Sequence, residues 1–385
     1  MTDLRAPLAG VVVVSLEQAV SAPFATRQLA DLGATVIKVE RPGGDFARHY
    51  DSVVAGESAF FVWANRGKQS IVLDVKDETD LATLRALIAG ADVFLHNLSP
   101  RAGASLGIGA DELVRKYPSL IACEISGYGH GGPRTDDKAY DLAIQAEAGA
   151  FSVTGEEAPS KVGFSVADIC AAMYTLSSIL AALVRRERTG EGAAIQVSML
   201  DALAEWMSAP MYAAVYGPGQ APRTGRRHHA IAPYGTFELS DGSTVLIAVQ
   251  SDPEWRSLAA SLLDDEPLGT DPRFETNTVR IANVDELEAI ISAGLAGMPA
   301  GEAHRRLAAG RIANARVNDL LGVWNHEQLR ARDHFHAVST PSGEIEMLDA
   351  PFDISGWPLP HEPVPALDEH DADVVQAVID RGRAQ

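Results

Sequence analysis

Cysteine and positive charge are both scarce in this chain of 385 residues. Its 2 cysteines, Cys123 and Cys170, fall in apolar segments, which favours small core residues over a disulfide or a metal pair. Lys and Arg total 32 against 52 Asp and Glu, so the net charge is −20. This balance argues against nucleic acids and anionic membranes as partners, because both are polyanions. Binding of an anionic small molecule would need a local cluster of basic residues.

Several sequence signals are also absent. The apolar runs are interrupted before they reach bilayer length, and no basic-then-apolar leader follows Met1, so a soluble cytoplasmic protein is expected. No GxGxxG motif follows the first predicted strand and no Walker loop occurs, which argues against a nicotinamide cofactor. The pair His228-His229 lacks the helical spacing or the cysteine partner of a zinc site, and no metal is expected.

Predicted strands and helices alternate along the N-terminal part of the chain. The strands are expected at 11–16, 35–40, 70–73, 93–96 and 120–126, and the helices at 21–32, 78–89 and 110–117. This alternation is typical of an α/β fold, a parallel sheet with helices on both faces. Such sheets bind ligands at the carboxyl ends of their strands. The candidate motifs at those ends cover 17–19, 41–44, 96–100 and 126–133.

The pattern changes in the second half of the chain. A strand at 193–197 and a helix at 199–212 precede a Gly- and Pro-rich linker at 216–224. A β-hairpin with Asp241-Gly242 in its turn follows, and then helices at 253–263 and 284–293. We therefore predict a large domain of 1–215 and 316–385, and a smaller α+β domain of 225–315. A last helix is expected near 371–381.

Asp168 is the strongest candidate for chemistry. It precedes the apolar segment 169–184, which is free of Pro and Gly and predicts a buried helix with Asp168 at its N-cap. A carboxylate there would stay ionised, because backbone N–H groups and the helix dipole favour its charge. Such an Asp is usually a helix cap. It can also be a nucleophile whose acyl adduct those N–H groups stabilise.

The order of short motifs along the chain resembles one enzyme family. The opening segments 7–13 and 31–45 are followed by Asn65-Arg66-Gly67-Lys68, then by segments at 73–76, 126–129, 139–141 and 188–201. Together they resemble the family III CoA-transferases, the superfamily of carnitine CoA-transferase, formyl-CoA transferase and α-methylacyl-CoA racemase. The resemblance covers nearly the whole chain. It implies a Rossmann-like large domain built from both chain ends, a small domain, and an interlocked homodimer.

The resemblance also implies roles for individual residues. Asp168 matches the nucleophile, which would pass through a mixed anhydride to an aspartyl-CoA thioester. Acyl-CoA would be a substrate, with no permanently bound cofactor. The positions matching CoA contacts are Gln18, Ala19, Arg41, Leu73, Lys76, Asn97, Leu98 and Lys138. Many relatives have Arg where this chain has Ser105, and Arg101 is a possible substitute. The alternative for each basic residue is a solvated surface charge.

Transfer is favoured over racemisation at two positions. The racemase His falls near Tyr140, and its Glu falls near Gln250-Ser251, where no Glu stands. Tyr is a poor general base at neutral pH, because its ordinary pKa is about 10. Asp141 is expected to be a structural hydrogen-bonding residue. An acyl-CoA isomerase, either a racemase or an intramolecular CoA shuttle, remains the alternative.

Two segments, 226–235 and 249–255, resemble the branch acting on small C4–C5 dicarboxylates of the succinate, mesaconate, citramalate and itaconate type. A second substrate carboxylate would need cationic or N–H donors. The candidates for contacts to the acyl group are His130, Tyr140, Arg226, Arg227 and His229. The alternative is that Arg226, Arg227 and His229 only form a domain junction and its surface, and that His130 is a simple loop residue.

Overall fold

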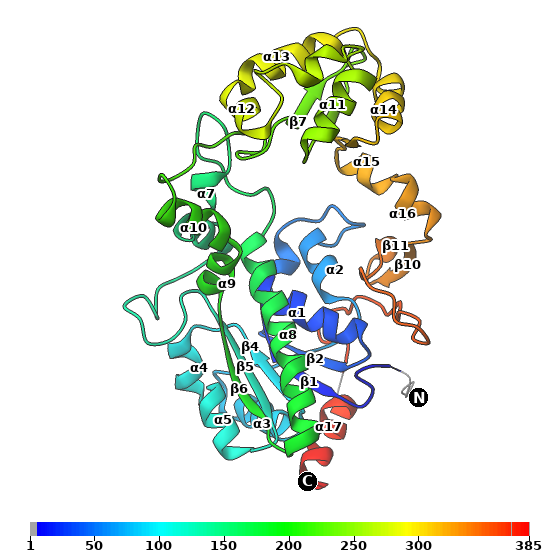
Figure 1. Cartoon of the computed structure of the whole chain (residues 1–385). Coiled ribbons are helices and arrows are strands. Elements are labelled where there is room, and N and C mark those ends of the chain that lie inside the picture. Colours follow the sequence, from blue (N-terminus) through cyan, green and yellow to red (C-terminus); the bar gives the residue numbers. More distant parts are fainter. Residues whose placement is uncertain (1–5, 371, 385) are drawn as a thin grey trace. The chain divides into compact units, whose positions relative to one another are not determined.

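The computed structural model describes residues 6–370 and 372–384. The chain divides into two compact units (Figure 1). The first comprises the described residues of Met1–Ala150, Lys161–Ala209 and Arg330–Gln385, and the second comprises Phe151–Ser160 and Pro210–Leu329. These boundaries differ from those expected from the sequence at 215–225 and 315, since the second unit also takes in most of a helix that begins at Ser208 and a helical segment after 315.

A six-stranded sheet forms the centre of the first unit, in the order β3-β2-β1-β4-β5-β6. All its paired strands are parallel, as the strand and helix alternation predicts. The chain passes from β3, at one edge, through the following helix to β4, which pairs with β1, so the strand order reverses between β1 and β4. The strands are β1 (Val12–Leu16), β2 (Thr35–Glu40), β3 (Lys68–Val72), β4 (Val93–His96), β5 (Ile121–Ser126) and β6 (Ala193–Ser198).

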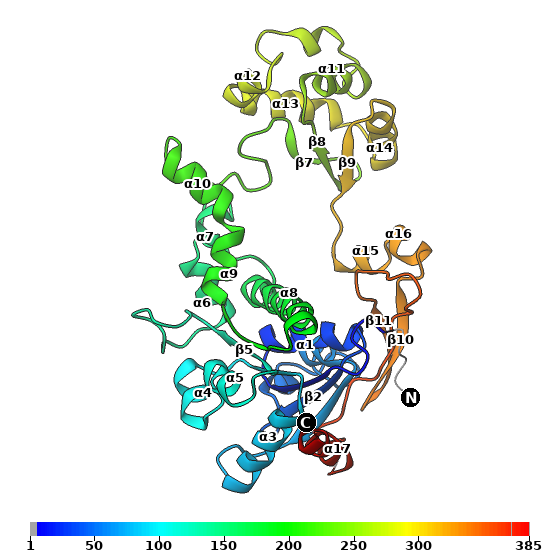
Figure 2. The same cartoon turned by 60° about the horizontal axis from the view of Figure 1, so that its bottom comes forward.

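Helices cover both faces of this sheet (Figures 1 and 2). Neighbouring strand residues point to opposite faces, so Val13 packs in one core and Val14 in the other. The Val13 side is covered by α1 (Ser21–Asp31), α8 (Val166–Thr189) and α9 (Met199–Trp206). The Val14 side is covered by α3 (Glu78–Gly90), α5 (Ala110–Lys116) and α17 (Ala372–Ala384). Cys123 and Cys170 are buried free thiols in the Val13 core, as predicted.

The helix α8 corrects the prediction that Asp168 is its N-cap. It begins at Val166 with Ser165 at the N-cap, so Asp168 lies inside the first turn and is not the cap. It ends at Gly190 in a left-handed conformation, with φ of 73°, behind Arg186 and Arg188. Among the described residues it is also the one helix whose length and composition would suffice to cross a membrane, although 56% of its apolar window is buried in the protein. The core helices of soluble proteins share this composition.

The second unit is built on a three-stranded antiparallel sheet in the order β7-β8-β9. The predicted hairpin is present as β7 (Tyr234–Glu238) and β8 (Thr244–Ala248), whereas β9 (Ala313–Arg316) has no clear alternation in the sequence. Its core gathers around Trp255 and Phe274. The helices are α11 (Asp252–Ser261), α12 (Asn277–Ala282), α13 (Val284–Leu295), α14 (Ala300–Ala309) and the 3-10 turn η2 (Pro267–Thr270).

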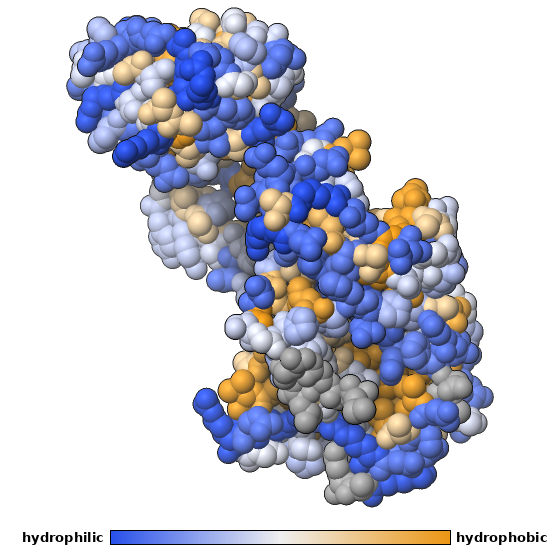
Figure 3. All heavy atoms as spheres, turned by 90° about the vertical axis from the view of Figure 1, so that its right-hand side faces the viewer, coloured by the Kyte–Doolittle hydropathy of each residue, from blue (hydrophilic) through white to orange (hydrophobic). Residues whose placement is uncertain are grey.

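The remaining elements connect these layers. The helix expected at 199–212 is two helices, because the chain breaks at Met207 between α9 and α10 (Ser208–Tyr216). A hairpin of β10 (Phe335–Thr340) and β11 (Gly343–Leu348) precedes α17. On the face drawn in Figure 3 hydrophilic residues predominate, in keeping with the net charge of −20. The short helices are η1 (Phe46–His49), α2 (Ala59–Asn65), α4 (Pro100–Leu106), α6 (Asp141–Glu147), α7 (Ala150–Val153), α15 (Leu320–Trp324) and α16 (Glu327–Ala331).

Candidate active site

Two cavities lie at the carboxyl edge of the parallel sheet, and both are lined by Gln18 and Leu98. The larger, of about 540 Å³, also has Asn97, Tyr140 and Asp168 in its wall. The smaller has a volume of about 380 Å³. Gln18 follows β1 and Leu98 follows β4, so the cavities open where the strand order reverses. Open parallel sheets bind their ligands at this position.

The corner formed by Gln18 and Ala19 is fixed by hydrogen bonds to two side chains, Asn97 and Asp45. The Gln18 N–H donates to Asn97 Oδ1 at 3.0 Å, and Asn97 Nδ2 donates to the Gln18 carbonyl at 2.7 Å. Ala19 has a φ of 63°, a left-handed conformation that residues with a Cβ rarely adopt. Its N–H donates to Asp45 Oδ1 at 3.1 Å. These contacts fix the backbone of a turn that forms part of the wall of the larger cavity.

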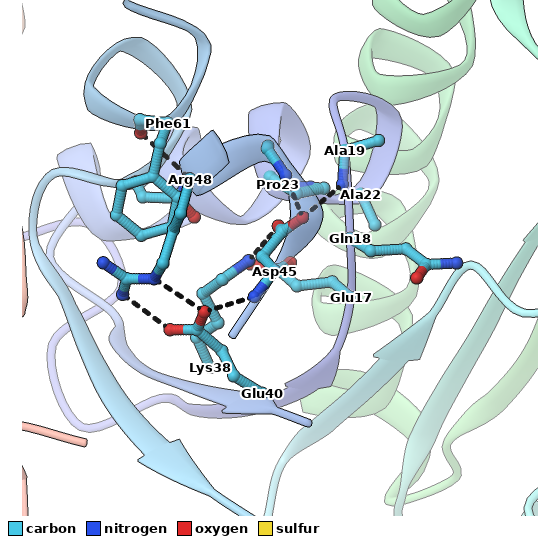
Figure 4. A network of polar contacts seen from close by, with 12 residues as sticks. Glu17, Gln18, Ala19, Ala22, Pro23, Lys38, Glu40, Asp45, Arg48 and Phe61 are labelled. Atoms are coloured by element: carbon cyan, nitrogen blue, oxygen red, sulfur yellow. Dashed lines mark hydrogen bonds and ion pairs between the residues drawn. The ribbon is translucent and has the colours of Figure 1, made fainter. Parts of the chain in front are cut away.

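A buried ionic network supports this corner (Figure 4). Lys38 Nζ lies 2.9 Å from Asp45 Oδ2 and 3.4 Å from Glu17 Oε1. Lys68 Nζ lies 2.7 Å from the same Glu17 oxygen. Burial alone would raise the pKa of Glu17, but the two ammonium groups outweigh it and the pKa is lowered. Burial lowers the pKa of Lys68 to about 7, whereas Glu17 and Asp45 outweigh burial at Lys38 and raise its pKa, so Lys38 is the lasting cation of the network.

Glu40 extends the network from the end of β2. Its two oxygens accept from Arg48 Nη2 at 2.7 Å and Nε at 2.9 Å, and Oε2 also accepts from the Asp45 N–H at 2.8 Å. Burial works to raise the pKa of Glu40, but the Arg48 and Lys38 charges and the Ser70 hydroxyl bring it to about 2. The Arg48 guanidinium also stacks 3.7 Å from the centroid of the Phe61 ring. The short η1 segment that carries Arg48 is thus tied to the sheet.

The first turn of α8 is capped by Asp141. Its Oδ1 accepts from the N–H of Ala167 at 2.8 Å and that of Asp168 at 3.4 Å, and its Oδ2 accepts from Gln145 Nε2 at 2.7 Å. This is the structural hydrogen-bonding role that the sequence suggests for Asp141. It also leaves the side chain of Asp168 free of the capping role.

The carboxylate of Asp168 instead faces the N-terminus of α1. The N–H and the hydroxyl of Ser21, the first residue of that helix, both act on it and lower its pKa. The Ser21 hydroxyl oxygen accepts from Asn97 Nδ2 at 3.3 Å, so Asn97 joins Ser21 to the Gln18 corner. Burial and the negative charge of Asp141 raise the pKa of Asp168 to about 7, against the smaller opposing effect of Ser21. The expectation of a carboxylate stabilised in its charged form is therefore wrong, because burial outweighs the donors.

Comparison with known sequences identifies the family. The sequence model of CoA-transferase family III matches residues 8–371. The chain belongs to this family. It is 36% identical over 375 residues to the acetyl-CoA:oxalate CoA-transferase of Acetobacter aceti, covering 96% of this chain and 95% of the relative. It is 33% identical to the succinate–glutarate CoA-transferase of Agrobacterium fabrum, with 97% of each chain covered.

The solved structures agree with this assignment. A CAIB/BAIF family protein from Brucella suis superposes with a TM-score of 0.85 at 32% identity, covering 97% of this chain and 99% of that one. The succinyl-CoA:mesaconate CoA-transferase of Haloarcula marismortui is a further relative, 30% identical with 96% of each chain covered. The protein is thus a family III CoA-transferase with the α/β fold and six-stranded parallel sheet expected for it.

The basic residues that the resemblance assigns to CoA are distributed unequally around this CoA-transferase's cavities. Arg41 and Lys76 line the smaller cavity and Lys138 lines the larger one, and all three side chains are exposed. Arg41 Nε donates to the Gly44 carbonyl at 3.0 Å. Arg101 is exposed on α4 and lines neither cavity. Leu73 is buried in the core on the Val14 side of the sheet and also lines neither.

The candidates for acyl contacts fall in different parts of the molecule. Tyr140 lines the larger cavity. His130 lies outside that lining, with its Nε2 2.8 Å from Glu124 Oε2. The second unit holds the other three candidates. Arg227 pairs there with Asp285 at 2.8 Å and Glu288 at 3.3 Å.

Arg226 and Arg227 line a cavity of about 370 Å³ that belongs to the second unit alone. The third candidate there, His229, stacks on His228 with a centroid distance of 4.8 Å. The contact of these residues with the substrate stays a prediction.

Two further residues near Asp168, Ser21 and Tyr50, were not predicted from the sequence. Ser21 is visible only as the start of a helix, and nothing in the local pattern links it to Asp168. Tyr50 lines the larger cavity, in edge contact with Phe60 at 5.5 Å between centroids. Burial and the charges of Asp45 and Asp168 raise the pKa of Tyr50 to about 12, which keeps its hydroxyl protonated and able to donate a hydrogen bond.

Proposed function

We propose that this enzyme moves CoA from an acyl-CoA thioester to a small C4–C5 dicarboxylic acid through a covalent thioester on Asp168. The observation that carries the proposal is the surroundings of Asp168. It lines a cavity at the switch point of the sheet together with Ser21, whose N–H and hydroxyl lower its pKa, and it has no ion pair with any described residue. Relatives named for succinate, glutarate and mesaconate support the C4–C5 class, and the relative named for oxalate supports a small dicarboxylate more broadly.

The chemistry begins when the Asp168 carboxylate attacks the donor thioester carbonyl. The C–S bond breaks, CoA leaves as its thiolate, and a mixed anhydride remains. The thiolate then attacks the Asp168 carbonyl carbon, releases the donor acid as a carboxylate, and leaves an aspartyl-CoA thioester. The acceptor carboxylate attacks this thioester and expels the thiolate. The thiolate takes the acceptor acyl group from the second anhydride, and the Asp168 carboxylate is regenerated.

The electrostatics of Asp168 favour this covalent route. Burial and the Asp141 charge disfavour the ionised carboxylate, and both anhydride and thioester replace that charge with a neutral acyl group. The same surroundings that raise the pKa therefore stabilise the acylated residue relative to the free carboxylate. The Ser21 N–H stays directed at the Asp168 oxygens, where it can stabilise the oxyanion that forms during each attack.

CoA itself needs positive charge, since its phosphates are anionic. Arg41 and Lys76 are the cations that line the smaller cavity, and Lys138 is the cation that lines the larger one. Of the acidic residues in the smaller lining, Glu17, Glu40 and Asp45 are already paired in the buried network. We assign the nucleotide end to the smaller cavity and the thioester end to the larger, beside Asp168. Arg101, exposed on α4, is retained as an outer phosphate contact.

The second carboxylate of the substrate is assigned to Arg226. Arg227 is already paired with two acidic residues, whereas Arg226 is exposed with no ion pair to a described residue. We expect Arg226→Ala to raise KM for a dicarboxylate by about tenfold, and KM for a matched monocarboxylate much less. Equal effects on both acids would refute this assignment and leave Arg226 a surface residue.

The interlocked homodimer completes the proposal. Large apolar side chains are exposed along α9 and α10, and they include Trp206, Tyr212, Val215 and Tyr216. Soluble proteins seldom leave such a set uncovered. Light scattering coupled to gel filtration is expected to give twice the chain mass, and a monomer at micromolar concentration would contradict the dimer.

Trapping tests the mechanism directly. The enzyme is mixed with succinyl-CoA, quenched with hydroxylamine, and digested for mass spectrometry. We expect a hydroxamate on Asp168 in the wild-type protein, its loss in Asp168→Asn, and a fall in transfer rate of at least about a thousandfold. Transfer that persists unchanged in Asp168→Asn would refute the aspartyl intermediate. Exchange of the α-hydrogen with deuterated solvent, without acyl exchange, would point to the isomerase.

A further inference from the structure

A cluster of three side chains with metal-ligand chemistry lies in the first unit, outside the lining of the two active-site cavities. His336 lies on β10, Asp349 directly follows β11, and His361 lies in the segment that leads to α17. One ligand atom of each lies within 4.8 Å of the others. The β10–β11 register sets Phe335 opposite Leu348, which brings His336 and Asp349 to the same open end of the hairpin.

The contacts inside this cluster do not have the geometry of normal hydrogen bonds. Asp349 Oδ1 touches His336 Nδ1 and lies 3.3 Å from His361 Nε2. Even so, both ring nitrogens of His336 and this Asp349 oxygen are buried without a hydrogen bond to any described residue. Buried polar atoms nearly always have a partner, and each exception needs a cause. One cation between the three side chains would give a partner to an atom of each.

The donor set indicates the kind of cation. Two imidazoles and one carboxylate suit zinc and similar divalent transition metals, whereas calcium and magnesium prefer oxygen ligands alone. Two ligand atoms bound to one zinc ion lie about 3.3 Å apart when the bonds are about 2.0 Å and tetrahedral. The separation of 3.3 Å between His361 and Asp349 has this value, whereas His336 and Asp349 lie closer than this and one of them has to shift before both can bind the ion. The nearby Arg66 guanidinium opposes a cation, but it is paired with Asp31 at 3.0 Å.

The side chains differ in their freedom to adjust. His336 and Asp349 are 10% and 13% exposed, whereas His361 is 46% exposed. The two imidazole rings are stacked, with centroids 3.4 Å apart and planes 11° from parallel. Parallel rings direct their lone pairs side by side, so His361 has to turn before both histidines can bind one ion. Its exposure leaves room for that turn and provides the route of entry for the ion.

We propose that His336, Asp349 and His361 bind one divalent transition-metal ion of the zinc class. The ion joins the β10–β11 hairpin to the segment that leads into α17. Its role is structural, since none of the three residues lines the cavities beside Asp168. The proposal is independent of the CoA-transfer mechanism.

Titration of tag-free, chelator-treated full-length protein with Zn²⁺ tests the site. Calorimetry is expected to show one ion per chain in the wild type, and Co²⁺ is expected to give visible absorption bands of a low-symmetry site. His361→Gln and Asp349→Asn should each weaken Zn²⁺ binding by at least about tenfold. His326→Gln is the matched control, because His326 is exposed and lies outside the cluster. This control should bind as the wild type does.

Thermal unfolding and activity separate the possible outcomes. Zn²⁺ should raise the Tm of the wild type and of His326→Gln by a few degrees, and should leave that of His361→Gln unchanged. The rate of CoA transfer is expected to stay the same in all these variants. Wild-type protein that binds no Zn²⁺, or His361→Gln protein that binds it equally well, would overturn the proposal. The three residues would then be a hydrogen-bonding cluster completed by water.

Discussion

Two carboxylates at the carboxyl edge of the sheet have opposite surroundings. Asp45 is 2% exposed, lies 2.9 Å from the Lys38 ammonium, and accepts the N–H groups of Ala19 and Ala47. Asp168 has no ion pair with a described residue, and the charge that shifts its pKa belongs to another carboxylate, Asp141. The first group is compensated on all sides, whereas the second is held close to a like charge.

This difference separates a positioning residue from a reactive one. A buried carboxylate that is fully paired has no free electron pair directed at a ligand, and its value lies in the backbone that it holds. A carboxylate with a raised pKa is more stable when its charge is removed, by a proton or by an acyl group. Asp45 therefore shapes the Ala19 turn, and Asp168 is the group suited to form a covalent intermediate.

The largest expected effect is on the buried network around Asp45. Lys38→Met removes the cation between Asp45 and Glu17 and leaves a buried charge unpaired, so the free energy of unfolding should fall by about 3–5 kcal/mol. Urea denaturation measures it. The control Lys116→Met, at an exposed helix end, should change stability by less than about 0.5 kcal/mol. A Lys38 variant as stable as the control would mean that the network is not ionised.

Asp168→Asn should stabilise the folded protein, in contrast to Lys38→Met. The pKa of Asp168 is about 7 in the folded protein and about 3.8 when unfolded, so its ionisation costs stability as pH rises from about 4 to 7. Removing the charge should raise the Tm by a few degrees at pH 8, with less gain at pH 5. Differential scanning calorimetry at both pH values measures the change. A Tm gain that does not depend on pH would show that this carboxyl has an ordinary pKa.

Ser21→Ala is expected to act on catalysis more than on folding. Loss of the hydroxyl removes a donor that favours the charged form, so the pKa of Asp168 should rise further and kcat/KM at pH 7 should fall by about tenfold. The deficit should shrink at pH 9, where the carboxyl is ionised in both proteins. Ser177→Ala, an exposed serine on α8, is the matched control. A deficit that stays constant with pH would assign Ser21 a purely structural role.

The smallest effect is a shift in the pH profile. Because the nucleophile is the carboxylate, kcat/KM should rise by about tenfold between pH 6 and pH 8 around a midpoint near 7. In Asp141→Asn one cause of the raised pKa is lost while a capping side chain is kept, so the midpoint should move to lower pH. Initial rates at low acyl-CoA concentration measure it. A midpoint that does not move would leave burial as the whole cause.

Many strands and helices of the first unit could be predicted from the local sequence pattern. The strands at Thr35–Glu40 and Val93–His96 have the predicted bounds, because short apolar runs between turn residues are strong signals. The Asp-Gly turn located the β7–β8 hairpin for a similar reason. The break at Met207 and the strand β9 had no such signal. A short exposed strand is stabilised by pairing with β8, which its own residues do not reveal.

The sequence alone determined the family, the parallel sheet and the position of Asp168 at the start of a long helix, because these depend on order and periodicity along the chain. Only the tertiary structure decided how Asp168 behaves. The helix α8 is capped by Asp141, which frees Asp168 from that role. Burial among elements distant in sequence raises the pKa of Asp168, and Ser21 on α1 opposes this effect. Helix position predicts a stabilised charge, but desolvation and a neighbouring charge depend on packing in three dimensions, and here they are the larger effects.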